Sequence, residues 1–137
     1  MRVAYADTDK AQVVHHAAYF RFLEAARVEL WRAAGLDYRL FEEETGLGLP
    51  VVEARLRYRV SARFDDLIEV ETWVTKASRA SVWYDAVVRR EPREPGAARV
   101  LLLESSIRLA CVSLAEGAIR RVPDAVFDAS FEPGWSV

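Results

Sequence analysis

The chain has few of the residues that build disulfides and metal centres. Cys111 is its only cysteine, which excludes an intramolecular disulfide, and a zinc site would need histidine and carboxylate ligands. Its only histidines, His15 and His16, are adjacent, and adjacent side chains rarely point at one ion. We therefore expect neither a metal nor a redox cofactor. In its apolar strand, Cys111 is expected to be inert packing rather than a nucleophile.

Long apolar runs are absent as well. Runs such as Val100 to Leu103 are far shorter than the roughly 20 residues of a membrane-spanning helix, so we expect no membrane insertion. Met1 leads directly into charged and polar residues rather than a signal-peptide pattern, which favours a reducing cytoplasm. The net charge of −2 provides no electrostatic basis for binding nucleic acid.

Lysine is scarce, and arginine replaces it. Only Lys10 and Lys76 are lysines among the 19 basic residues, which leaves 17 arginines. Two interpretations stay open. The bias fits a GC-rich genome, and it also fits a protein in which some guanidinium groups bind phosphate.

The remaining pattern predicts one α+β domain over residues 1–137. A short strand over Arg2 to Ala6 precedes a helix from about His16 to Ala34, whose apolar arc covers half its circumference. Gly35 is a C-terminal cap, and a second short helix over Tyr38 to Thr45 ends at Gly46. Such a wide arc predicts a helix wrapped by other structure.

From Val51 onward the period changes to that of strands. The segment "VVEARLRYRVS" alternates, which predicts a strand with one buried face made of Val52, Ala54, Leu56, Tyr58 and Val60. Further strands are expected in "DDLIEVETWVTKA", "SVWYDAVVRRE" and "ARVLLLESSIRLACVSL", the last bent near Ser105 and Ser106, and in a final strand after a turn at Glu116–Gly117. Consecutive strands with short turns build an antiparallel sheet. Asp65 and Asp66 are expected in a turn, and the strand tyrosines and tryptophans in the core or an interface.

The segment "YADTDKAQVVHHAAYFRFLEAAR" resembles the opening motif of hotdog-fold acyl-CoA thioesterases, in the branch of 4-hydroxybenzoyl-CoA thioesterase and the Tol-Pal-associated enzymes. The matching positions are Tyr5, Asp7, Thr8, Asp9, Val13, Val14, His16, Tyr19, Phe22, Glu24, Ala26 and Arg27. The later "YRVSARFDDLIEVET" resembles the family's second signature. Two positions depart from the motif: Gln12 replaces a usual glycine, and Ala18 replaces a frequent asparagine or serine.

The resemblance implies a hotdog fold, with an antiparallel sheet of five or six strands wrapped around one long helix. It also implies a homodimer or dimer of dimers with sites at the subunit interface, and acyl-CoA as substrate. The catalytic pair it implies is Asp9, as general base or nucleophile, and His16, whose backbone N–H polarises the thioester carbonyl. Tyr5, Val14, His15, Ala17 and Tyr19 are expected to contact substrate, with His15 at a variable position of the motif.

The start of the helix suits the binding of an oxyanion. No Ser, Thr, Asp or Asn directly precedes Ala17, so no local side-chain cap is expected, and N–H groups stay free for a ligand oxygen. The His16 side chain has two open interpretations: it contacts the thioester or orients water, or it packs against Tyr19 or bonds a carbonyl. Asp7 is expected to orient the loop, and Thr8 to be structural.

Alternative functions also remain open. Glu24 is a reserve carboxylate, although we expect it to pair with Arg27. An enoyl-thioester hydratase on the same fold would carry Asn-Pro between its Asp and His, where this chain has "DKAQVVHH". A non-catalytic acyl-CoA sensor is the third interpretation, which the substitution at Gln12 leaves open.

Overall fold

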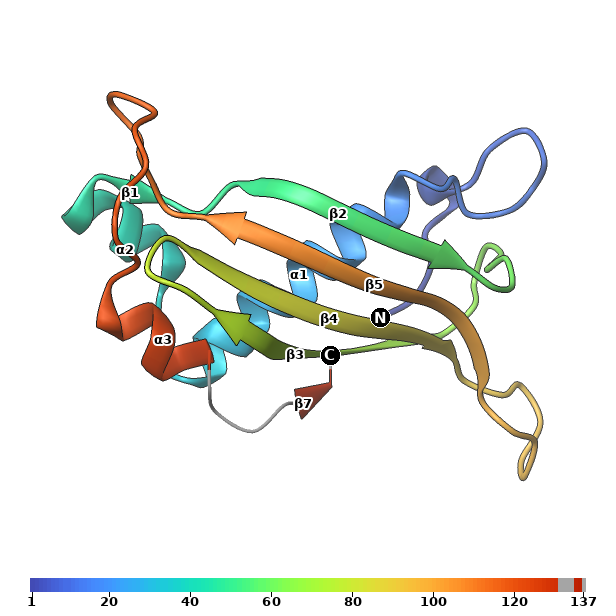
Figure 1. The fold of residues 1–137 in the computed structure, drawn as a ribbon. Helices are drawn as coiled ribbons and strands as arrows, with labels where there is room; N and C mark the ends of the chain where they lie inside the picture. Colours follow the sequence, from blue (N-terminus) through green and yellow to red (C-terminus); the bar gives the residue numbers. More distant parts are fainter. Residues whose placement is uncertain (131–134, 137) are drawn as a thin grey trace.

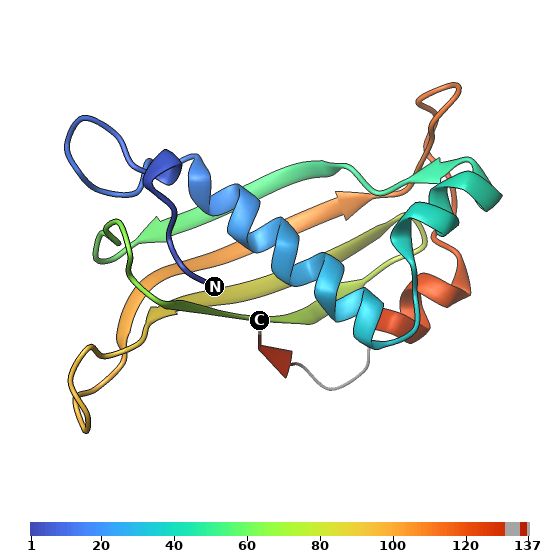
Figure 2. The same cartoon turned by 180° about the vertical axis from the view of Figure 1, so that it is seen from behind.

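The computed structural model describes residues 1–130 and 135–136, and its main antiparallel sheet carries a long helix on one face (Figures 1 and 2). The sheet has the strand order β2-β5-β4-β3-β7, and β1 and β6 form a separate pair. Its strands are β1 (Leu47–Gly48), β2 (Val51–Tyr58), β3 (Ile68–Ala77), β4 (Ser81–Arg90), β5 (Val100–Ala110), β6 (Val112–Ser113) and β7 (Trp135–Ser136). The helices are the 3₁₀ turn η1 (Tyr5–Asp7), α1 (Ala18–Ala33), α2 (Tyr38–Thr45) and α3 (Asp124–Ser130).

The long helix forms where the apolar arc predicted it. Phe22, Leu23, Ala26 and Leu30 of α1 are buried against the sheet, because residues three and four apart share one helix face. Gly35 follows with φ of 88°, a left-handed conformation that glycine adopts without steric cost. The predicted second helix is confirmed as α2, ending at Gly46 in the left-handed region.

The predicted buried face of β2 is wrong for the single chain. Val52, Tyr58 and Val60 are 47%, 46% and 44% exposed, Ala54 is also exposed, and only Leu56 is half-buried. The alternation itself is present, but β2 is an edge strand, paired only with β5. The chain therefore leaves one edge of its sheet open and apolar.

Three further predictions of elements need correction. The expected first strand over residues 2–6 reduces to a single bridge between Arg2 and Leu67, followed by η1. Ser105 and Ser106 pair regularly with β4, and the irregularity lies instead between Val88 and Arg89. The expected last strand is only the bridge Val112–Ile119, because the turn at Gly117 brings few residues into register.

Helix α3 was not predicted from the sequence. A buried hydrogen-bond triangle holds it against α1 and the sheet: Trp31 Nε1 donates to Tyr84 Oη at 2.8 Å, and Tyr84 Oη lies 2.6 Å from Ser130 Oγ. Burial raises the pKa of Tyr84, so its hydroxyl stays protonated in this triangle.

The two ends of the sheet carry different structures. Helices α2 and α3 and strand β1 gather at one end, and the loop between η1 and α1 lies at the other, near the end of β2 (Figures 1 and 2). Within residues 1–130 and 135–136, no helix is long and apolar enough to cross a bilayer.

Candidate active site

The segment before α1 is fixed by Asp7, which is buried. Its Oδ2 accepts from the Ala4 N–H at 2.9 Å, and its Oδ1 accepts from the Arg21 guanidinium. Its carbonyl accepts from the His15 N–H at 2.8 Å. Asp7 therefore ties the loop to α1, as the sequence predicted, and its carboxylate is fully engaged in structural bonds.

Asp9 lies in a tight turn with its carboxylate exposed. The Ala11 N–H donates to Oδ1 at 2.8 Å, and the Asp9 N–H donates to the Val13 carbonyl at 3.0 Å. The turn requires a φ of 63° at Gln12, which L-residues other than glycine adopt at a steric cost. This explains physically why glycine suits this position of the motif, and Gln12 adopts the same turn under strain.

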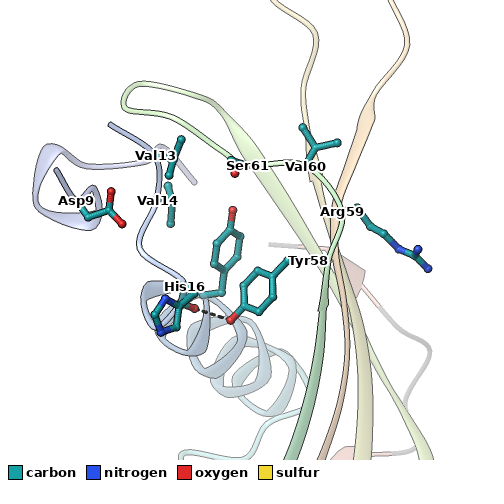
Figure 3. A pocket seen from close by; sticks show the side chains of 9 residues that line it. Asp9, Val13, Val14, His16, Tyr58, Arg59, Val60 and Ser61 are labelled. Carbon is teal, nitrogen blue, oxygen red and sulfur yellow. Dashed lines mark hydrogen bonds between the residues drawn. The ribbon is translucent and has the colours of Figure 1, made fainter. Parts of the chain in front are cut away.

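Asp9 and His16 line the same cleft, which has a volume of about 340 Å³. Its wall contains Asp9, Val13, Val14, His16, Tyr19, Tyr58, Arg59, Val60 and Ser61. Figure 3 shows Asp9 on its loop and His16 near the start of the helix, with Tyr58 reaching across from β2 while Arg59 points away. The two residues predicted to be catalytic are thus brought to one cavity.

The structure brings together only some of the residues expected to contact substrate. Val14 and Tyr19 line the cleft, whereas Tyr5, His15 and Ala17 do not. The Tyr5 side chain is 78% exposed, with its ring against Phe64 at a centroid distance of 5.7 Å. Glu24, the reserve carboxylate, lines a separate cavity farther along α1.

The N-cap residue Ala17 makes no side-chain cap hydrogen bond, as expected, but the N–H groups at the start of the helix are not all free. The Ala17 N–H donates to His15 Nδ1 at 3.2 Å, and the Ala18 N–H donates to the His15 carbonyl at 2.9 Å. The His16 N–H donates to no residue that the structure describes. The N–H of His16, a residue of the cleft wall, is therefore available to a ligand at the positive end of the helix dipole, which favours negative charge.

Two tyrosines complete the wall beside His16. Tyr58 Oη donates to the His16 carbonyl at 2.7 Å, and Tyr19 Oη accepts from the Ala62 N–H at 3.2 Å. Burial raises the pKa of both phenols, so they remain neutral at physiological pH. Sequence reasoning assigned Tyr58 to a core or an interface, and it gave no signal for the cleft residues Arg59, Val60 and Ser61.

The chemistry available here is that of a carboxylate and a backbone donor. In the part of the chain that the structure describes, no three His, Cys, Asp or Glu side chains gather in a way that could hold a metal ion. A carboxylate can remove a proton from water or attack a carbonyl directly, and a free N–H can stabilise the oxyanion that either attack produces.

Comparisons with known proteins identify the family of the chain. The model of the thioesterase superfamily matches residues 11–97. The acyl-CoA thioesterase YbgC of Haemophilus influenzae is 33% identical over 114 residues, covering 83% of this chain and 79% of that protein.

Solved structures share the fold over almost the whole chain. The hypothetical protein TT1821 from Thermus thermophilus has a TM-score of 0.81 at 36% identity, covering 95% of this chain and 93% of that chain. The DHNA-CoA thioesterase from Staphylococcus aureus has a TM-score of 0.83 at 28% identity, covering 95% of this chain and 85% of that chain. The predicted hotdog arrangement, one long helix against an antiparallel sheet, is confirmed.

Proposed function

Because the chain belongs to the thioesterase superfamily, we propose that it hydrolyses acyl-CoA thioesters to a free acid and CoA, as one catalytic domain. One observation carries this proposal: Asp9 and His16 line one cleft, and the His16 N–H donates to no residue that the structure describes. The curated relative from Haemophilus influenzae is named an acyl-CoA thioesterase, which supports the same reaction.

In the proposed mechanism, the thioester carbonyl oxygen accepts a hydrogen bond from the His16 N–H. As general base, Asp9 takes a proton from water, the new hydroxide attacks the carbonyl carbon, and the carbon–sulfur bond breaks to release the CoA thiolate, which is then protonated. As nucleophile, Asp9 attacks the same carbon, expels the thiolate and forms an anhydride that water hydrolyses. Both routes use the same carboxylate and the same backbone donor.

We also propose that the protein is a homodimer or a dimer of dimers, joined along β2. An edge strand with unpaired backbone groups and exposed apolar side chains readily pairs with another strand. Val51, Val52 and Tyr58 on β2 are between 43% and 47% exposed. Antiparallel pairing of two β2 strands about a twofold axis buries this edge, and it places the Tyr58 end of one strand beside the start of the other. The cleft then lies at the subunit interface.

We assign the activity to the cytoplasm, where acyl-CoA is made and used. The single cysteine is buried and burial raises the pKa of its thiol, which suits a protein that does not depend on oxidation. The proposed reaction needs no cofactor, no nucleic-acid partner and no insertion into a membrane.

The proposal is tested by offering the purified protein a panel of acyl-CoAs with a free-thiol reagent. We expect thiol release from at least one aliphatic or aromatic acyl-CoA, far above the rate without protein. Acyl-CoA binding without thiol release would support the sensor instead. Addition of water to crotonyl-CoA with the thioester intact would support the hydratase.

A further inference from the structure

A second cavity lies at the other end of β2 from the Asp9 cleft, between α1, α2 and the β1–β2 segment. Its volume is about 340 Å³, and no residue lines both cavities. Its wall is mainly apolar, but it also contains Arg27, Tyr38, Glu24 and Glu42. The other wall residues are Val28, Trp31, Gly48, Leu49, Pro50, Val51, Val112 and Leu114.

Arg27 is an unusual residue to find in this wall. Arg27 is only 6% exposed. Its side chain makes neither a hydrogen bond nor an ion pair with any residue that the structure describes. The Nε atom is buried without an acceptor. Burial lowers the pKa of Arg27, but an arginine stays charged at neutral pH. The Trp31 ring, 5.9 Å from the guanidinium carbon, and the charge of Glu24 are its nearest compensation. A guanidinium in a mainly apolar wall without a hydrogen-bonded counter-ion is costly, so this arrangement is suited to receive an anion.

The neighbouring polar groups do not meet this need. Glu24 was expected to pair with Arg27, but its side chain is exposed and forms no ion pair with it. Burial raises the pKa of Tyr38 to about 12, and the nearby Glu42 carboxylate adds to the effect. Tyr38 Oη also accepts from the Leu49 N–H at 2.9 Å. Neither Tyr38 nor Glu42 bonds to Arg27, so the Arg27 donors remain available to a ligand.

We propose that this cavity binds the carboxylate group of a small organic acid, with the Arg27 guanidinium as its principal partner. A guanidinium matches the two oxygens of a carboxylate in geometry and charge. Trp31 and Tyr38 stack with their ring centroids 5.0 Å apart, and with the aliphatic wall they accommodate an apolar body. Glu24 and Glu42 disfavour a multiply charged anion such as phosphate, so a single carboxylate on an apolar chain or ring is the fitting ligand.

This carboxylate has two possible sources. A free acid can enter the cavity of any chain. In the proposed β2 pair, the Arg27 cavity of one chain comes beside the Asp9 cleft of the other, because Val51 and Tyr58 lie at opposite ends of β2. The carboxylate can then be the far end of an acyl group whose thioester lies in that cleft. This second source rests on the proposed function, whereas the first does not.

Direct binding tests the site without any turnover. Calorimetry with hexanoate should show saturable binding, and the uncharged hexanamide should bind about tenfold more weakly, as expected for loss of a charge-assisted hydrogen bond. Arg27→Gln and Arg27→Met should weaken hexanoate binding to the level of the amide. Both variants should stay folded because they remove a charge whose burial is costly, and they break no hydrogen bond or ion pair within the described residues. Arg32→Gln, an exposed change on the same helix, is the matched control and should bind like wild type.

A kinetic arm separates the two sources. Glutaryl-CoA and pentanoyl-CoA have acyl chains of equal length and differ in a terminal carboxylate. A preference for glutaryl-CoA of about tenfold in kcat/KM that disappears in Arg27→Gln assigns the site to the acyl group. Binding of hexanoate without that preference assigns it to free acids. The inference is overturned if hexanoate and hexanamide bind alike. It is also overturned if Arg27→Gln changes neither hexanoate binding nor the preference for glutaryl-CoA, or if this variant instead converts an oligomer to a monomer. Absence of all thiol release would refute the proposed function alone.

Discussion

The Tyr58 hydroxyl donates a 2.7 Å hydrogen bond to the carbonyl of His16, and so joins the end of the edge strand to the residue that begins the helix turn. The same peptide segment carries the His16 N–H that faces no described acceptor. The position of the proposed oxyanion donor therefore depends on a side chain from β2.

Replacing Tyr58 by phenylalanine removes this bond and little else. We expect Tyr58→Phe to lower kcat/KM about fivefold to tenfold, in line with one hydrogen bond of about 1 kcal/mol, mainly through kcat. The free energy of unfolding in urea should change by less than about 1 kcal/mol, because the ring is partly exposed. A loss of unfolding free energy as large as the loss of transition-state stabilisation calculated from kcat/KM would assign Tyr58 a purely structural role.

Gln12 tests the strain of the Asp9 turn. Its φ of 63° favours glycine, so Gln12→Gly should raise the free energy of unfolding by about 0.5–1 kcal/mol after the entropy cost of glycine. Gln12→Val should lower it by about 1–2 kcal/mol, because a β-branched residue resists this conformation. Urea unfolding of the two variants measures both effects, and a more stable valine variant would contradict this description of the turn.

Asp66 should make the free energy of unfolding depend on pH in the acidic range. Burial opposes its ionisation, but the Arg63 N–H and the guanidinium groups of Arg93 and Arg90 outweigh burial and hold its pKa below the ordinary value. A group with a lowered folded pKa stabilises above its unfolded pKa, and this stabilisation is lost as pH falls through the folded pKa.

Asp66→Asn should therefore cost about 2 kcal/mol at pH 7, measured by urea unfolding. The gap between variant and wild type should narrow at pH values below about 4, where the aspartate takes up its proton. Asp128→Asn, on the exposed face of α3, provides a control with little effect. A gap that stayed constant from pH 7 to strongly acidic conditions would show that the ion pairs are not its cause.

The open edge of β2 predicts the effect of a charge on assembly. We expect Val52→Lys to shift the protein towards a monomer in light scattering after size exclusion, because lysine on an edge strand opposes strand pairing. Thr75→Lys places the same charge on β3, on the opposite side of the sheet from β2, and should leave the mass unchanged. An unaltered oligomer in Val52→Lys would place the interface elsewhere.

The sequence was most informative where a helical pattern of apolar residues ended at a glycine. The apolar arc and Gly35 located α1, and Gly46 with its φ of 66° located the end of α2. Asp9 and His16, which the motif selected, line one cleft. They are close because the turn and the helix start are local structures only a few residues apart. These features depend on short-range rules that a single chain carries in its own sequence.

Other features depend on what lies beside a segment. Alternation in β2 distinguishes two faces, but it does not tell whether this chain or another one covers the apolar face. Helix α3 has seven residues and is held by the contact of Ser130 with Trp31 and Tyr84, which come from distant segments. The hydrogen bond from the Ala17 N–H to His15 Nδ1 escaped prediction because imidazole is not among the side chains that usually bond at helix starts. Arg27 was expected to pair with Glu24 on spacing alone.

The central claim is that Asp9 drives hydrolysis, and steady-state kinetics of Asp9→Asn tests it most directly. This change keeps the size of the side chain and the acceptor for the Ala11 N–H but removes the charge. We predict that kcat falls by about 10²–10⁴ with an unfolding transition close to wild type, while Asp128→Asn retains full activity. A folded Asp9→Asn protein that hydrolyses acyl-CoA within about tenfold of the wild-type rate, well short of the general-base range, would contradict the account.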